Sequence, residues 1–381
     1  MFDKIYQYNF PTTIRFGAGV VHELGDYLKN NKLNSPLIVT DPVVEKLGFF
    51  KAIIAELKKH QIGVEVFSDI HKNPVKSDVY KGTDAYDLTK RDSIIGIGGG
   101  AALDVARAIV LRVNHREDLF KYDDLIGGDV YVTNDVPHFI TIPTTAGTGS
   151  EVGRSAIIAD DDTHQKKILF SPKLLAKIIF ADPILTMELP PAVTAATGMD
   201  ALTHNLEAYI AKMEHPLCEG IALEGISLIG NAIVKAVNKP DIESRSKMLI
   251  ASLMGAIAFQ KGLGVVHSLA HPLSSLLDTH HGLANAVNLP YGMEFNVPVC
   301  EEKFRKIART LEIADESGAG VVNYLHELNA KINIPHTLSD IGVREEHIET
   351  LSDLAIADFA HPNNPKPVTR EDFKTLYQKA L

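Results

Sequence analysis

The stretch IIGIGGGAALD, residues 94–104, decides the fold of the first half of the chain. Its first four residues are typical of a buried strand, the glycines predict a tight turn, and the remainder opens a helical pattern. Glycines at such a turn let backbone N–H groups approach a phosphate at the helix N-terminus. Gly96, Gly98 and Ala101 fit a dinucleotide fingerprint, but no acidic residue ends a strand about 20 residues further on. A strand-to-helix turn without a ligand is therefore the alternative.

Short β-branched runs alternate with amphipathic helical patterns on both sides of this turn. That alternation is typical of a mostly parallel sheet covered by helices. The apolar spacing predicts helices at residues 43–59, 75–88 and 102–113. Strands are predicted at residues 37–40, 64–67, 94–97, 139–142, 156–159 and 178–180.

The pattern changes after Asp182-Pro183, where β-branched runs disappear and long periodic apolar segments dominate from residue 192 to about 300. Three prolines between residues 183 and 191 interrupt any regular element. A chain of 381 residues is long enough for two cores. We therefore predict an α/β dinucleotide-binding domain with a mostly parallel sheet at residues 1–185, followed by an all-α domain at residues 186–381.

The composition of the chain argues against several classes of function. The formal net charge is −10 and no basic stripe is present, which argues against nucleic acid as a partner. The two cysteines lack the spacing of a zinc site or redox motif and indicate a reducing compartment. The start of the chain, residues 1–10, carries Asp3 and Lys4 and lacks the apolar core of a signal peptide. The longest uncharged apolar run, residues 248–259, is shorter than the roughly 20 residues that span a bilayer, so we expect a core helix there and a cytoplasmic protein.

A second loop follows the predicted strand at 139–142 and reads PTTAGTGSE, residues 143–151. Hydroxyl donors beside flexible backbone suit a pyrophosphate or a ribose, although a polar turn with satisfied threonines is the alternative. Ligands of open parallel sheets bind beyond the carboxyl ends of the strands, where both loops are expected. Asp41, just after the strand at 37–40, could bind an adenosine ribose and repel a 2′-phosphate, which favours NAD over NADP. A helix N-cap before Pro42 explains Asp41 equally well.

Histidines and one aspartate are concentrated in the helical half. Asp200 and His204 are four residues apart, so both side chains project from one helix face. His267 and His271 repeat this spacing, and a histidine pair at 280–281 stands at a turn. A lone histidine among apolar residues is usually a satisfied core residue, but three such segments together predict a metal site. The spacing does not say which histidines of the last two segments bind the metal.

This combination of side chains favours a catalytic metal. One carboxylate with imidazoles suits Fe²⁺ or Zn²⁺, whereas hard ions prefer oxygen ligands. The absence of cysteine ligands argues against a structural zinc site. With one position left open for a substrate oxygen, such an ion acts as a Lewis acid.

Together these motifs resemble the iron-containing (group III) alcohol dehydrogenases, the family that includes lactaldehyde reductase and 1,3-propanediol dehydrogenase. The likeness runs from residues 16–19 to residues 361–365. It rests on the glycine turn ending in Asp104, the loop at 144–151, the Asp200/His204 helix, the His267/His271 helix and the pair at 281–282.

The resemblance divides the histidines and names the cofactor contacts. It implies that the metal ligands are Asp200, His204, His267 and His281. His271 then falls at the position of a non-ligand histidine near the substrate, and we take it as the candidate proton relay. The implied contacts to NAD are Asp41, Asn73, Gly98, Gly99, Gly100, Asp104, Thr144, Thr145, Thr148 and Lys167, the last less secure because Lys166 precedes it. The chain departs from the family at Ala101, where Ser is usual, and at Arg107, where Lys is common.

The activity implied is interconversion of a primary alcohol, diol or hydroxy acid and its aldehyde, by hydride transfer to or from NAD(H) with Fe²⁺ or, alternatively, Zn²⁺. Two other activities of the superfamily are the alternatives: a metal- and NAD-dependent lyase of the dehydroquinate synthase type, and a metal-independent reductase of the maleylacetate reductase type. The resemblance also implies a homodimer or larger homo-oligomer.

Overall fold

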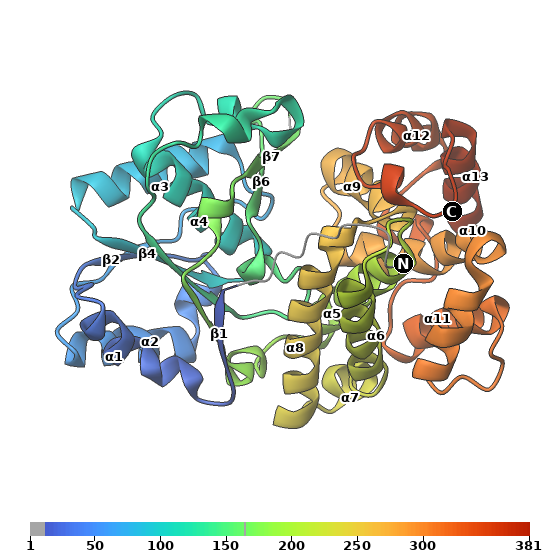
Figure 1. Ribbon diagram of the computed structural model, residues 1–381, viewed down its shortest axis with the longest axis horizontal. Coiled ribbons are helices and arrows are strands. Elements are labelled where there is room, and N and C mark those ends of the chain that lie inside the picture. Colours follow the sequence, from blue (N-terminus) through green and yellow to red (C-terminus); the bar gives the residue numbers. More distant parts are fainter. Residues whose placement is uncertain (1–11, 164) are drawn as a thin grey trace. The chain divides into compact units, whose positions relative to one another are not determined.

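The structure is a computed structural model and describes residues 12–163 and 165–381. These residues form two compact units (Figure 1). The α/β unit comprises residues 12–145 and 149–187, and the helical unit comprises residues 146–148 and 188–381. Each unit buries its own set of apolar side chains.

A six-stranded sheet forms the centre of the α/β unit. All of its pairings are parallel, and the strand order is β1-β8-β5-β4-β2-β3. The predicted fold class, an α/β unit with a parallel sheet followed by an all-helical part, is confirmed. The strands are β1 (Thr13–Phe16), β2 (Pro36–Val39), β3 (Glu65–Phe67), β4 (Ser93–Gly98), β5 (His138–Pro143) and β8 (Ile178–Ala181).

Alternate residues of β4 face opposite sides of the sheet, as the pleat requires. Ile95 and Ile97 belong to a core cluster that includes buried residues of α1 and α2. Gly96 faces α4 on the other side, where a Cβ atom would lie 3.0 Å from Ala106 Cβ. This strand is therefore buried on both faces, which explains its continuous apolar run. The helices of this unit are α1 (Leu24–Asn30), α2 (Gly48–Lys59), α3 (Lys76–Leu88) and α4 (Gly100–Asn114).

The sequence did not predict two of the strands, and it assigned a third strand to the wrong sheet. β1 is a short edge strand whose residues are mostly exposed, so it has no apolar run. β7 (Lys166–Phe170) opens with two lysines. β6 (Ser155–Ala159), predicted as part of the parallel sheet, pairs antiparallel with β7 in a separate two-stranded sheet. Apolar runs predict strands but do not say which strands pair.

Every regular element of residues 188–381 is a helix. The central helix, α5, is buried on almost all sides and contacts α6, α8 and α10. The helices are α5 (Pro191–Ile210), α6 (Pro216–Gly230), α7 (Ile233–Asn238), α8 (Ile242–Ala258), α9 (Val265–Leu277), α10 (His281–Thr310), α11 (Gly318–Lys331), α12 (Ile348–Ile356) and α13 (Arg370–Ala380).

Short 3-10 helices occupy many of the connections between these elements. In the α/β unit they are Val20–Glu23, Val44–Lys46, Leu119–Tyr122, Asp124–Ile126, Gly128–Tyr131, Ser150–Val152, Pro172–Leu174 and Pro183–Thr186. In the helical unit they are Phe259–Lys261, Ser339–Ile341, Glu345–His347 and His361–Asn363.

The predicted core helix at residues 248–259 is the buried second half of α8 and the start of the 3-10 helix that follows it. Among the described residues, no single helix is long and apolar enough to cross a membrane. Only α8, continued to Lys261, and α9 pass that test as a pair, with a bend of 107° between them.

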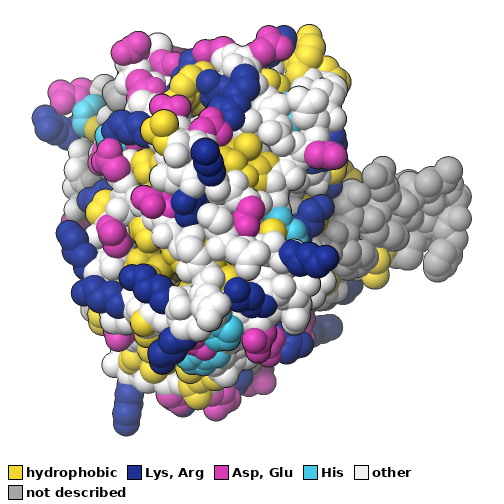
Figure 2. All heavy atoms as spheres, turned by 90° about the vertical axis from the view of Figure 1, so that its left-hand side faces the viewer, with side chains coloured by type: hydrophobic (Ala, Val, Ile, Leu, Met, Phe, Trp, Pro, Cys, Tyr) yellow, Lys and Arg dark blue, Asp and Glu magenta, His cyan; other side chains and the backbone are white. Residues whose placement is uncertain are grey.

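On the face drawn in Figure 2, lysine and arginine side chains are interspersed with aspartate and glutamate. That face offers no continuous basic surface of the kind that binds nucleic acid.

Candidate metal centre

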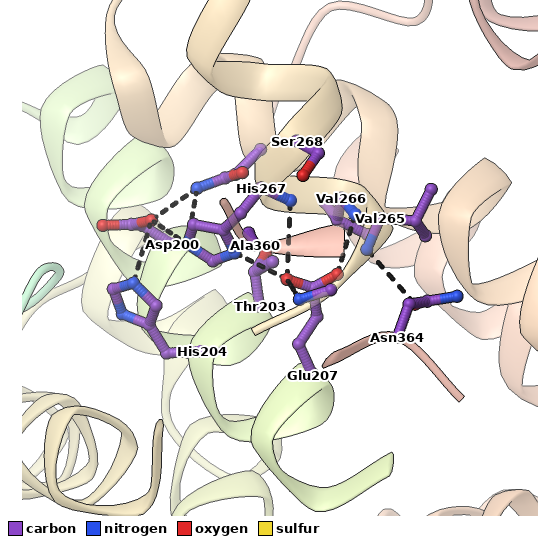
Figure 3. A network of polar contacts seen from close by, with 12 residues as sticks. Asp200, Thr203, His204, Glu207, Val265, Val266, His267, Ser268, Ala360 and Asn364 are labelled. Carbon is purple, nitrogen blue, oxygen red and sulfur yellow. Dashed lines mark hydrogen bonds and ion pairs between the residues drawn. The ribbon is translucent and has the colours of Figure 1, made fainter. Parts of the chain in front are cut away.

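Two of the predicted metal ligands lie on α5. Asp200 and His204 are one helical turn apart, and their exposed fractions are only 1% and 4%. His204 Nε2 lies 3.9 Å from Asp200 Oδ1. Figure 3 shows both side chains on the same side of the helix, as their i, i+4 spacing predicts.

The other two predicted ligands come from separate helices. His267 lies in the first turn of α9, and His281 is the first residue of α10. Their Nε2 atoms lie 4.0 Å and 3.4 Å from Asp200 Oδ1. One ligand atom from each of the four side chains lies within 4.8 Å of those of the others. Four donors from three helices therefore converge on one small volume.

The donors fit a divalent ion. Asn285, one turn after His281 on α10, places its Nδ2 atom 2.7 Å from Asp200 Oδ1 and 3.1 Å from His281 Nε2. The same Nδ2 atom lies 3.4 Å from His267 Nε2. Polar atoms of three predicted ligands thus converge on one NH₂ group, which has only two hydrogens to donate, whereas a divalent ion binds several such atoms at once. Sequence reasoning missed Asn285, although its i+4 spacing from His281 is a usable signal.

Burial and the neighbouring side chains together set the charge of these groups. It opposes ionisation of Asp200, but His204, His281 and His267 outweigh it and hold the pKa of this carboxyl at about 2. Burial also lowers the pKa of the His267 imidazole well below its usual value. A carboxylate beside a neutral imidazole is the state in which both groups bind metal.

His271 lies beside this cluster but is not one of its four members. Its ring stacks on that of His281 with centroids 5.4 Å apart, and on the half-exposed ring of Phe359 at 5.3 Å. His271 Nδ1 lies 2.8 Å from Asp358 Oδ2. Burial opposes ionisation of Asp358, but His271 and Ser268 keep its pKa at about 2. Asp358 also escaped sequence reasoning because it is far from His271 in the chain.

The predicted nucleotide loops meet at the carboxyl ends of neighbouring strands. Gly98, at the end of β4, has a φ of +153°, and a Cβ atom there would lie 3.5 Å from Asp41 Oδ2, at the end of β2. A Cβ atom on Gly99 would lie 3.3 Å from the Thr145 side chain, after β5. Thr144 donates its N–H to the carbonyl of Gly98 at 3.0 Å. Glycine therefore lets the backbone lie close to a carboxylate and a hydroxyl group at this edge of the sheet.

One Asp41 oxygen also has a local role. Oδ1 accepts hydrogen bonds from the N–H groups of Val43 and Val44 at 2.8 and 2.9 Å. Oδ1 therefore caps the backbone N–H groups that follow it, as the alternative interpretation of Asp41 predicted, whereas Oδ2 faces Gly98.

The remaining predicted cofactor contacts are spread more widely. Gly100 is the first residue of α4, and Asn73 lies in the loop before α3. Lys167 lies on β7, with its Nζ atom 3.4 Å from Asp123 Oδ2. Thr148 lies in the short segment 146–148 that belongs to the helical unit.

Asp104, another predicted contact, is held by a buried arginine. Its Oδ1 atom accepts hydrogen bonds from Arg107 at 3.1 Å and from the Ser150 hydroxyl at 2.7 Å. Arg107 is fully buried and also donates to the carbonyls of Ser150, Ser155 and Leu174. At this position, where the resemblance led us to expect Lys, all three nitrogen atoms of the guanidinium group donate hydrogen bonds.

Replacing Arg107 with lysine is expected to lower the free energy of unfolding by roughly 2–4 kcal/mol. The single ammonium group of lysine cannot replace the several N–H donors of the planar guanidinium group. Buried carbonyl groups that accept from Arg107 would therefore lose their hydrogen bonds. Urea unfolding of the metal-free protein measures the effect. An unchanged midpoint and slope would contradict the importance of this arginine.

Known proteins match this chain over nearly its whole length. A family model described as "Iron-containing alcohol dehydrogenase" matches residues 11–183, and one described as "Fe-containing alcohol dehydrogenase family, C-terminal" matches residues 194–381. The chain is 34% identical to the 4-hydroxybutyrate dehydrogenase of Cupriavidus necator, over 98% of this chain and 99% of that protein. It is 32% identical to the NAD-dependent methanol dehydrogenase of Bacillus methanolicus, over 97% and 98%. The crystal structure of a 1,3-propanediol oxidoreductase superposes with a TM-score of 0.95 at 31% identity, over 99% of this chain and all of that one.

Proposed function

Because the chain belongs to the iron-containing alcohol dehydrogenase family, we propose that it is a metal-dependent dehydrogenase that uses NAD(H) and a small primary alcohol. The chain is an oxidoreductase that interconverts alcohols and aldehydes. The identities of the metal, the nucleotide and the substrate are proposed below from the chemistry of the side chains. One observation carries it: the convergence of Asp200, His204, His267 and His281 within 4.8 Å.

The proposed metal is Fe²⁺, with Zn²⁺ as the alternative, because one carboxylate and three imidazoles suit both ions. The proposed nucleotide is NAD, since a carboxylate at Asp41 would repel the 2′-phosphate of NADP. The closeness of Asp41, Gly98, Gly99, Thr144 and Thr145 at the carboxyl ends of neighbouring strands supports this assignment. Asn73, Asp104, Thr148 and Lys167 remain predicted contacts.

Each part of the proposed site has a separate task. When bound, the ion would supply Lewis-acid chemistry at the substrate oxygen, and NAD would supply the capacity to take up a hydride. The four ligands hold the ion in a buried position, where electrostatic stabilisation is strong. Asp358 accepts a hydrogen bond from His271 Nδ1, which leaves Nε2 of that ring to take the alcohol proton.

Replacing His271 with alanine is expected to lower kcat roughly 100-fold, the usual contribution of a positioned general base, while the metal content stays unchanged. His280→Ala is the matched control, because His280 is exposed and only one residue from a predicted ligand. Steady-state rates across the pH range and metal analysis of each variant test this. Full turnover of the His271 variant at every pH would remove the relay role, and loss of metal would make His271 a ligand.

The substrate class follows from the relatives. Three relatives are named for 4-hydroxybutyrate, methanol and 1,3-propanediol, which are short primary alcohols; the first also carries a carboxylate and the last a second hydroxyl. We therefore propose a short primary alcohol, diol or hydroxy acid.

The test is an NADH absorbance assay with protein purified without oxygen. Methanol, 1-butanol, 1,3-propanediol and 4-hydroxybutyrate are supplied with NAD or NADP, before and after chelation. The expected result is NADH formation with at least one alcohol, lost on chelation and restored by Fe²⁺ or Zn²⁺. Activity that survives chelation would favour the maleylacetate reductase type. Absence of NADH formation with every alcohol, even after Fe²⁺ or Zn²⁺ is added, would contradict the proposed substrate class.

We further propose a cytoplasmic homodimer or larger homo-oligomer, with a nucleotide-binding domain at residues 1–185 and a metal-binding domain at 186–381. Light scattering of the purified enzyme tests the assembly.

A further inference from the structure

Glu207 is a buried carboxylate that the proposed mechanism does not use. It lies on α5, with only 1% of the residue exposed. Its Oε2 atom accepts hydrogen bonds from the N–H groups of Gly264 at 3.0 Å and His267 at 3.4 Å, and Oε1 accepts one from Val266 at 2.7 Å. Backbone N–H groups can only donate, so both oxygens act as acceptors.

The same carboxylate contacts a predicted metal ligand. His267 Nδ1 lies 2.6 Å from Glu207 Oε2, and Figure 3 shows the imidazole between Glu207 and Asp200. Three backbone N–H donors stabilise the ionised form of Glu207, which can only accept, so Nδ1 carries the ring hydrogen. The lone pair then belongs to Nε2, the atom 4.0 Å from Asp200 Oδ1.

We propose that Glu207 is a positioning residue for the metal centre, which fixes both the tautomer and the orientation of His267 so that Nε2 is presented to the ion. The inference rests on the proposed function, which makes His267 a ligand. Asp200, His204 and Glu207 are spaced i, i+4 and i+7, so one face of α5 supplies two ligands and the support of a third. Carboxylates that hold the second nitrogen of a ligand histidine in this way raise its basicity and keep the ring in place.

A purely structural role for Glu207 would be to cap α9, whose N-cap residue, Gly264, has no side chain. Asn364 also caps this turn, and its other hydrogen bonds join Asn296 and the carbonyl of Lys366 rather than the His267 ring. Asn364 Oδ1 accepts the N–H of Val265 at 3.2 Å in the same helical turn, but no hydrogen bond joins Asn364 to the His267 ring among the contacts of the described residues. Glu207 and Asn364 therefore form a matched pair: both cap the helix, and only Glu207 orients the ring.

The experiment compares cobalt affinity in Glu207→Gln, Asn364→Ala and wild-type protein by competition with a chelator. An amide offers one acceptor atom where the carboxylate offers two, so in either orientation its NH₂ group faces an N–H donor. The affinity of Glu207→Gln is expected to fall about 10–100-fold, the usual effect of losing such a partner. Asn364→Ala is expected to melt at a lower temperature but to keep its cobalt affinity within about three-fold, because loss of a cap does not act on the ring.

Histidine ¹⁵N spectra of the metal-free wild-type protein supply a test that needs no variant of Glu207. His267, assigned by its loss in His267→Gln, is expected as the Nδ1–H tautomer. An Nε2–H tautomer, an unchanged affinity in Glu207→Gln, or an equal loss in Asn364→Ala would each overturn the positioning role. Failure of wild-type protein to bind cobalt would instead refute the ligand set, and with it the proposed function.

Discussion

Asp200→Asn protein is expected to purify without metal and to lose at least roughly 1,000-fold in turnover. Asp200 is the only predicted ligand with a negative charge, and its Oδ1 atom is the point that all three predicted ligand histidines face. An amide of the same size keeps the packing of α5 but removes that charge. Lewis-acid stabilisation contributes several kcal/mol to such reactions, and each 1.4 kcal/mol is about a factor of ten in rate. Metal analysis and the NADH assay measure the two losses separately.

Asp278→Asn is the matched control for this variant. Asp278 is exposed and lies three residues before His281, so it shares the neighbourhood but is not part of the four-residue cluster. The control is expected to retain metal and turnover. Retention of both by Asp200→Asn would contradict the ligand assignment, whereas loss of metal with normal turnover would contradict the catalytic role of the ion.

Gly282→Ala is expected to lower the free energy of unfolding by about 2–3 kcal/mol and to weaken metal binding at the same time. Gly282 is the second residue of α10, where a Cβ atom would lie 2.4 Å from the Ala196 carbonyl oxygen and 3.2 Å from Asp200 Cβ. The added methyl group must push the start of α10 away from α5, because no flexible side chain can yield there. That movement separates His281 from Asp200. Urea unfolding and cobalt titration of the metal-free protein measure the two effects.

Gly220→Ala provides the comparison. Gly220 is an exposed position of α6 at which a Cβ atom would meet nothing within 4 Å. Alanine should there leave stability unchanged or raise it by up to about 1 kcal/mol, since glycine is a weak helix former. If the Gly282 variant matched the Gly220 variant in both measurements, the close approach of α5 and α10 would not matter for the site.

The fold could be predicted where sequence patterns reflect burial. β4 is buried on both faces and ends in glycines, so its run of apolar residues identified it. β1 could not be found in this way, since it lies at an exposed edge. The helix predicted at residues 43–59 is interrupted at Leu47, whose backbone is extended, and apolar spacing does not detect a one-residue break. The pairing of β6 with β7 depends on contacts that no local pattern encodes.

Local spacing found part of the candidate site. The Asp200/His204 pair follows from helix periodicity, and the structure brings both residues together with His267 and His281. Periodicity treated His271 and His267 alike, and only the family resemblance separated them. Glu207 and Asp358 went unnoticed because each supports a histidine on another segment of the chain. A hydrogen bond between distant segments produces no regular spacing of residues in the sequence, so a sequence pattern cannot predict it.

The four predicted ligands come from α5, α9 and α10, which are separate stretches of the chain. An ion held by them would act as a removable cross-link within the helical unit. Binding to the folded state alone adds a stabilisation that grows with the logarithm of free ion concentration over Kd. Scarcity of that ion would then reduce more than the active fraction: it would expose metal-free chains to local opening and proteolysis, so that the supply of the ion would govern how long each molecule survives.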